Sequence, residues 1–350
     1  MNYYNLIINL ALIKRINSIQ TYFPTLPAFY ALYHIIKNKL SNITIFFIFL
    51  IITFSIANYS ESISDFNLIR LIQLITLIVF ADYSFKFISE KEIELGFKCV
   101  AIISSLMILM QHFGENIYDS RFLWIFERVP GLSGEPNYTG ATLLSIIIFF
   151  LYNKNHKWAF FVFLIGLFSF SRGYIFSSAL IIFLIIFKKI KLNYLKHFSK
   201  ILILIFFLYP FLLHLTFLIL PDNLFVKIYE QDVRIKNHLY YYFEVIENKP
   251  FGLGVGNNHE YYKNNYKKYV ESKLDKDEVH EQHNLPLQIL SELGLAFYAI
   301  FIIFVIFTLL SINHSWPILL ILMPYSFLNG MNEILLYILV PYFIKKERYD

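Results

Sequence analysis

Charged side chains are scarce in this sequence. Asp, Glu, Lys and Arg together make up 16% of the 350 residues, whereas 57% of the residues are apolar and 19% are aromatic. An ordinary soluble domain carries about 25% charged residues. Because so few charges cannot cover a water-exposed surface, the composition argues against an ordinary soluble domain.

Cysteine is nearly absent as well, since Cys99 is the single one. The chain therefore cannot form an internal disulfide, and a thiolate metal site is not expected. The first 13 residues lack a basic start followed by a small-residue cleavage site, so we expect no cleavable signal peptide. The formal net charge of +5 comes from Lys and Arg residues in short loops, and we expect no nucleic-acid partner.

What the sequence does contain is a series of long apolar stretches. They predict an all-α integral membrane protein with about 10 to 12 transmembrane helices, in a single membrane domain that covers residues 1–350. Residues 19–36 are either a further span or a helix in the membrane interface, and both interpretations stay open. The other spans are expected at residues 42–58, 66–88, 95–112, 138–153, 156–170, 173–187, 198–220, 285–309, 316–328 and 333–344.

The loops between these spans indicate an orientation. Lys188–Lys200 carries five lysines and no acid, which is typical of a cytoplasmic loop. Residues 37–39, 154–157 and 345–348 are basic and fall on the same side, whereas residues 57–66 contain two acids and no Lys or Arg. This alternation places residues 221–284, the one long polar stretch, outside the cell membrane as a large extracytoplasmic loop.

Gly131–Asn137 lies at the outer mouth of the 138–153 span. Its Gly and Pro residues suit a turn, and Asn137 or Thr139 can cap the helix that follows. In the alternative interpretation, Glu135 presents a carboxylate at a helix start that faces outward. The sequence leaves both interpretations open.

Ser171-Arg172-Gly173 joins two short spans at the outer surface. An arginine at this depth is costly unless it snorkels to the headgroups, pairs with an acid or binds an anion. Gly173 permits a sharp turn at this point. Snorkelling and anion binding are equally compatible with the segment.

Arg234 stands near the start of the long outer loop, and the glycine-rich run Pro250–Gly256 follows it. The glycine spacing is not a dinucleotide fingerprint, because no βαβ unit surrounds it. A glycine run can still let backbone amides approach a phosphate. Between Arg234 and Pro250, apolar residues recur at helical spacing and predict an amphipathic helix on the membrane surface. These residues are Ile235, Leu239, Tyr242, Phe243 and Ile246.

His280-Glu-Gln-His283-Asn284 leads into the 285–309 span. Two histidines three residues apart can bind zinc, but no third ligand is spaced to join them, and we expect no metal site. Asp275-Lys-Asp277 reads as a solvated charge run. His283 at the membrane surface is the better candidate for a general base, since the imidazole pKa lies near neutral pH.

Taken in order, these segments resemble the superfamily of O-antigen polymerases and O-antigen ligases, which are bacterial envelope glycosyltransferases. The resemblance covers about residues 125–300. Each motif is weak alone, whereas the ordered set with one long outer loop before His-Asn is fairly specific. The residues that carry it are Gly134-Glu-Pro-Asn137, Ser171-Arg172-Gly173, Arg234, Lys249-Pro-Phe-Gly-Leu-Gly254, His283-Asn284 and Leu290-Ser-Glu292-Leu-Gly294-Leu.

The resemblance implies an all-helical membrane glycosyltransferase of the type (GT-C-like) that uses lipid-linked sugar donors. It implies a metal-independent enzyme without a cofactor, with Arg172, Arg234 and His283 as the catalytic residues. Substrate-binding positions are expected at Glu135, Asn137, Gly252, Gly254 and Asn284.

By the same resemblance, the protein would sit in the bacterial cytoplasmic membrane with its active site facing the periplasm or the cell exterior. Its donor would be an undecaprenyl-diphosphate-linked oligosaccharide, membrane lipid would surround it, and a chain-length regulator is implied as a partner. Glu135 favours the polymerase branch, which makes O-antigen or capsule. The alternatives are a ligase that transfers glycan to lipid A core or protein, and a polysaccharide transporter or flippase. Against the transporter, the sequence shows no internal repeat.

Overall fold

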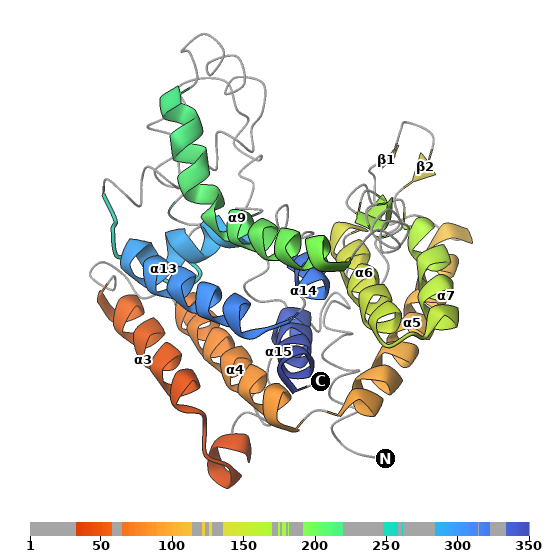
Figure 1. Cartoon of the computed structure of the whole chain (residues 1–350), viewed down its shortest axis with the longest axis horizontal. Coiled ribbons are helices and arrows are strands. Elements are labelled where there is room, and N and C mark those ends of the chain that lie inside the picture. The colour runs from red at the N-terminus through yellow and green to blue at the C-terminus, as the bar shows by residue number, and fades with distance from the viewer. Residues whose placement is uncertain are drawn as a thin grey trace.

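The computed structural model of this chain describes residues 33–57, 65–87, 89–113, 121–122, 126–127, 136–169, 174–175, 177–179, 181, 192–219, 248–257, 261, 284–313, 315–322 and 334–349. The described part is mostly helical (Figure 1). Two strands of two residues each, β1 (Arg121–Phe122) and β2 (Phe126–Glu127), form one antiparallel pair. The helices are α3 (Asn42–Ala57), α4 (Asp65–Phe87), α5 (Glu90–Phe113), α6 (Pro136–Tyr152), α7 (His156–Leu167), α9 (Leu192–Ile219), α13 (Leu285–Ser311), α14 (Trp316–Leu322) and α15 (Ile334–Tyr349).

The expected spans coincide with these helices. Agreement is within two residues at both ends for α3, α4, α6 and α13. Helix α6 begins at Pro136, so Asn137 and Thr139 lie inside the helix, and the prediction that one of them caps it is wrong. Proline suits the first helical position, where no partner for its missing N–H is needed. The spans at 173–187 and 316–328 are described only in part, and the region 19–36 lies largely outside the described residues.

The apolar part of the 198–220 span begins at His197, as predicted, but the helix itself starts six residues before the predicted span. Helix α9 begins at Leu192, so Lys196 and Lys200 belong to its first turns and not to a loop. Lys200 Nζ donates a hydrogen bond to the Ile312 carbonyl over 2.7 Å, and this bond stabilises the lysine side chain within the helix. Pro210 lies inside α9, and the helix bends visibly along its length (Figure 1), as expected where a proline removes a backbone hydrogen bond.

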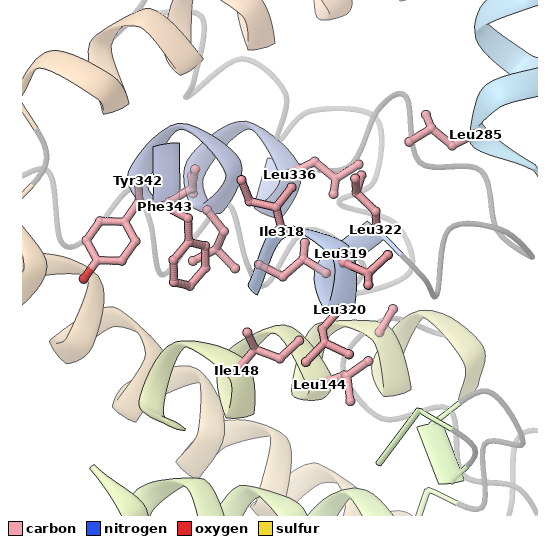
Figure 2. Close-up of a cluster of buried hydrophobic side chains, with 14 of the residues drawn as sticks. Leu144, Ile148, Leu285, Ile318, Leu319, Leu320, Leu322, Leu336, Tyr342 and Phe343 are labelled. Carbon is pink, nitrogen blue, oxygen red and sulfur yellow. The ribbon is translucent and has the colours of Figure 1, made fainter. Parts of the chain in front are cut away.

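The core is apolar and takes in buried side chains from every described helix, and α14 lies within it against α6, α9 and α15. The short helix α14 packs between α6 and α15, and Figure 2 shows Leu320 against Leu144 and Ile148 of α6. These three side chains are at most 2% exposed. Aromatic rings extend the same core toward the end of α15, where Tyr152 and Phe343 meet edge to face with ring centroids 4.9 Å apart.

The segments predicted to be cytoplasmic gather at one end of the molecule, which we call the basic end. It comprises the residues before α3, the end of α4, the α6–α7 turn, the start of α9, the α13–α14 turn and the end of α15. Polar contacts join these segments across long separations in sequence. They include Lys86 Nζ to the Lys39 carbonyl (2.8 Å), Lys345 Nζ to the Lys86 carbonyl (3.3 Å), Lys346 Nζ to Asn153 Oδ1 (2.9 Å) and Ser199 Oγ to Ser315 Oγ (2.8 Å).

A buried carboxylate organises one corner of the basic end. Oδ2 of Asp82 lies 2.9 Å from Lys86 Nζ and 3.2 Å from His34 Nε2, and it accepts the backbone N–H of Ser41 over 3.2 Å. The Asp82 side chain is 4% exposed and the His34 side chain is fully buried. The segment before α3 is thereby fixed to the end of α4.

Two described helices are long and apolar enough to cross a membrane on length and composition: Glu90–Gln111 and Leu285–Ser311. Four shorter apolar helices of 10–17 residues accompany them. In the most apolar stretch of Leu285–Ser311, 28% of the residues are buried inside the protein. Most of that stretch therefore faces outward.

We expect Asp82→Ala to lower the free energy of unfolding by about 1–3 kcal/mol, because it strands buried donors without their acceptor. The matched control is Glu94→Ala, which removes another i,i+4 acid–lysine pair, Glu94–Lys98, whose side chains are each 31% exposed, together with a hydrogen bond from Asn155 Nδ2 to Glu94. A half-exposed pair of this kind contributes about 0.3–0.5 kcal/mol. Thermal unfolding of both variants measures the difference, and equal destabilisation would show that the Asp82 contacts do not hold this corner.

Candidate functional site

Helix α13 is broken near its first third. Gly294 has φ +82° and ψ 172°, which are not helical values. The helix therefore consists of a short segment, 285–293, and a longer segment, 295–311. Such a break frees backbone N–H and C=O groups from their usual partners four residues away. In a buried position these groups need partners from elsewhere in the chain.

The segment Pro250–Gly256, which we call the glycine loop, provides those partners. Its backbone runs against the break in α13 and exchanges hydrogen bonds with it in both directions. The three N–H···O=C bonds run from Leu253 to Ser291 (2.7 Å), from Gly254 to Glu292 (3.0 Å) and from Leu295 to Pro250 (2.8 Å). The loop and the broken helix thus form one backbone unit.

Gly252 and Gly294 make this close approach possible. Gly252 has φ +93°, and a Cβ atom there would lie 2.6 Å from the Glu292 carbonyl oxygen. A Cβ atom at Gly294 would lie 2.2 Å from the carbonyl carbon of Phe251. Both distances are shorter than any ordinary contact, and both backbones adopt the left-handed region that disfavours other residues. Glycine is therefore required on each side of the contact.

A row of polar side chains follows the first segment of α13. Asn284, Gln288 and Glu292 are spaced four residues apart, so they share one face of the helix, and Ser291 lies beside them. All four are at most 5% exposed. We call this row the polar stripe. The Asn284 side chain caps the helix by accepting the Leu287 N–H over 3.0 Å, while Gln288 Nε2 donates to Glu292 Oε1 over 3.2 Å.

Glu292 is the carboxylate of the polar stripe, and it is 5% exposed. A carboxylate buried among apolar helices is stable only with hydrogen bonds or a cation beside it. This position therefore holds a strong acceptor, suited to hydroxyl or guanidinium donors. Among the described residues, no group of three His, Cys, Asp or Glu side chains is arranged to hold a metal ion.

The structure joins three of the predicted site residues. Gly252 and Gly254 lie in the glycine loop, and Asn284 caps the helix to which that loop is bound. Asn137 lies on a different helix, in the first turn of α6, where it is half-buried. Their predicted contacts with substrate stay predictions.

The amides of the two loop glycines already have partners inside the protein. Gly252 N–H donates to the Lys249 carbonyl over 2.7 Å, and Gly254 N–H donates to α13. The structural role of these glycines is to hold the loop against the helix. A phosphate near this loop would need donors other than these two amides.

The remaining predicted residues lie outside the described part of the chain: His283, Arg172, Arg234, Glu135 and the amphipathic helix expected around 235–246. The roles of these residues remain predictions.

Sequence reasoning passed over Gln288 and Glu292 as site residues. The signal was present, since two polar residues four apart interrupt an otherwise apolar span, and such residues in a membrane span mark functional positions. The break at Gly294 had no comparable signal. A glycine within an apolar helix is common, and only the contact with the glycine loop shows why this one is left-handed.

We predict that Gly252→Ala destabilises the protein more than Gly254→Ala does. Both glycines have positive φ, at a cost of about 1–3 kcal/mol for alanine. At Gly252 the new methyl group also meets the backbone of α13, whereas at Gly254 the nearest atom is the Asn257 side-chain nitrogen at 2.8 Å. Adding overpacking, we expect about 2–6 kcal/mol for Gly252→Ala.

Thermal unfolding of the two purified variants tests this prediction. Gly254→Ala is the matched control, because Gly254 also has positive φ but its added methyl group would meet the Asn257 side chain and not the backbone of α13. If both variants unfold at the same temperature, the docking of the loop on α13 does not contribute to stability.

Comparisons with known proteins give no relative for this chain. No family model, no curated protein and no solved structure matches it. The function is therefore inferred from the motifs and from the geometry described above.

Proposed function

We propose that this protein is a polytopic membrane glycosyltransferase that polymerises an envelope polysaccharide, O-antigen or capsule. One observation carries the proposal. The Lys249–Gly254 and Asn284–Gly294 motifs, which lie apart in sequence and belong to the ordered set of the resemblance, meet in one hydrogen-bonded unit. A set of motifs that serves one active site is expected to be assembled in this way.

Two features support a location in the membrane. Large apolar side chains lie exposed on several helices, among them Met110 (73%), Leu310 (73%) and Phe307 (66%). Outward-facing side chains of this kind are stable against lipid and costly against water. The gathering of the basic segments at one end supports a multi-pass arrangement in the bacterial cytoplasmic membrane, with that end in the cytoplasm. The active site then faces the periplasm or the cell exterior.

The proposed donor is an undecaprenyl-diphosphate-linked oligosaccharide in the outer leaflet. The bond between the reducing sugar and the diphosphate breaks, and a hydroxyl group of the acceptor forms the new glycosidic bond. Arg172 and Arg234 neutralise the charge that develops on the departing diphosphate, because guanidinium groups match phosphate oxygens in geometry and charge. The diphosphate is itself the leaving group, so the reaction needs no metal ion in principle.

His283 is the proposed general base. It takes the proton from the attacking hydroxyl, a transfer typically worth about 10²–10⁴ in rate. The cap at Asn284 fixes the chain one residue beyond it, and the glycine loop holds that part of α13 in place. The polymerase acceptor is a second lipid-linked repeat unit. Lipid A core or a protein would be the acceptor of a ligase.

Deleting the gene in its host separates these classes by the surface polysaccharide that remains. Single repeat units on the lipid carrier or the core indicate lost polymerisation, which is the outcome we expect. Full-length polymer on the carrier indicates a ligase, and accumulation on the inner leaflet indicates a flippase. Either of the last two results overturns the polymerase proposal.

Complementation of that strain with variants tests the residues. We expect Arg172→Ala, Arg234→Ala and His283→Ala each to abolish chain extension while the protein remains in the membrane fraction. Arg172→Lys keeps the charge but loses the bidentate geometry, and should restore chain extension only in part. Wild-type polymer length in any alanine variant would remove that residue from the mechanism.

A further inference from the structure

A cavity of about 500 Å³ lies between α3, α4, α13 and α15, with contributions from α9 and α14. Its volume falls within the range of sites that bind small molecules. Apolar side chains from every one of these helices line it, with Phe47, Leu74, Ile78, Phe297, Phe301 and Val340 among them. Such a lining favours a hydrocarbon chain over a polar ligand.

The polar groups of this cavity are concentrated at the basic end. Ser41, Asp82, Lys86 and Arg348 line it there, whereas Leu285 marks its opposite end. Along α4 the lining runs from Leu74 to Lys86, about 18 Å at 1.5 Å per residue. The hydrocarbon layer of one membrane leaflet is about 15 Å deep, half of the full thickness. The cavity thus matches the depth of a single lipid tail whose headgroup lies at the basic end.

The charges at this opening favour an anionic headgroup. Asp82 is the one carboxylate among the described lining residues, and it is already paired with Lys86 and contacts His34. Because Asp82 neutralises the charge of Lys86, the positive charge of Arg348 is left over among the lining residues. The exposed Lys39 lies on the same side, since its carbonyl accepts from Lys86.

Arg348 has room to bind a phosphate. Its Nε and Nη2 atoms contact the Ser311 hydroxyl at 3.0 and 2.7 Å, and a guanidinium carries five N–H donors in all. The side chain is exposed at the opening. Basic pockets between transmembrane helices on the cytoplasmic side bind the headgroups of acidic lipids in this manner.

We propose that this cavity binds one tail of an anionic phospholipid of the cytoplasmic leaflet, with its phosphate held by Arg348 and Lys86. The inference rests on the membrane location in the proposed function, but not on the glycosyl transfer. The headgroup end of the cavity lies at the basic end, away from the proposed active site, whereas its apolar end reaches Leu285 beside Asn284. A headgroup held at Arg348 distinguishes a resident phospholipid from the sugar donor, whose diphosphate would lie at the other end.

Native mass spectrometry of the purified protein in mild detergent tests this inference, with phosphatidylglycerol and zwitterionic phosphatidylcholine as probes. We expect one phosphatidylglycerol per chain to be retained in preference to phosphatidylcholine. Arg348→Ala should weaken phosphatidylglycerol binding about fivefold. Ala81→Phe, which places a ring in the cavity beside Asp82, should abolish it.

The matched control is Lys91→Ala, which removes an exposed cation of α5 that does not line the cavity. It should leave phosphatidylglycerol binding unchanged, and thermal unfolding identifies any variant that has lost its fold. Equal retention of both lipids, or an unchanged affinity in the folded Arg348→Ala protein, would overturn the proposal. Recovery of a polyprenyl diphosphate as the bound lipid, insensitive to Arg348→Ala, would also overturn it and assign the cavity to the donor.

This measurement is independent of sugar transfer. A chain that binds phosphatidylglycerol at Arg348 but does not extend polysaccharide would contradict the proposed enzyme and leave the lipid site standing. A chain that extends polysaccharide without retaining phosphatidylglycerol would contradict the lipid site alone.

Discussion

Three backbone hydrogen bonds between the glycine loop and the break in α13 are the contacts on which the candidate site depends. A helix interrupted at Gly294 leaves polar backbone groups in an apolar interior, where each unsatisfied group costs free energy. The glycine loop supplies hydrogen-bond partners for these groups, and α13 supplies partners for the backbone groups of the loop. Neither element has a complete set of partners without the other. The contact therefore couples the long polar region before Asn284 to the helix that follows it.

The same requirement explains the polar stripe. Asn284 caps the first segment of α13, Gln288 donates to Glu292, and the Glu292 carbonyl receives the loop. Discontinuous helices that place polar groups inside a bundle are a familiar way to build binding sites in membrane proteins. At the other end of the molecule, the buried Asp82 carboxylate contacts His34 and Lys86 and so holds the residues before α3 against the end of α4. Both ends of an apolar bundle are thus fixed by a small number of buried polar contacts.

The two ends of the molecule differ in the polar groups that they present. The glycine loop and the polar stripe lie on the side proposed for sugar transfer, whereas the cavity opens toward cations at the basic end. Apolar helices separate them, with the aromatic rings of α3, α13 and α15 lining much of the space between. A resident lipid in that space would stabilise the packing of α3 and α4 against α13.

Hydropathy in the sequence was enough to locate the helices, because a run of apolar residues determines a helix almost independently of what surrounds it. The turn before α6 was predicted correctly, since proline acts locally, but Asn137 and Thr139 lie inside the helix and do not cap it. The start of α9 was misjudged because Lys196 and Lys200 looked like loop residues, and only the Ile312 carbonyl nearby shows how the helix accommodates Lys200.

By itself, the sequence determined the helical class, the order of the elements and the identity of the motif segments. Only the tertiary structure decided that Gly294 breaks its helix, that Gly252 lies against that break, and that Glu292 is buried and accepts from Gln288. The physical reason is the range of the interactions. Helix formation depends on neighbours a few residues away, whereas a backbone hydrogen bond from Leu253 to Ser291 joins residues that the sequence holds far apart, and no local pattern encodes it.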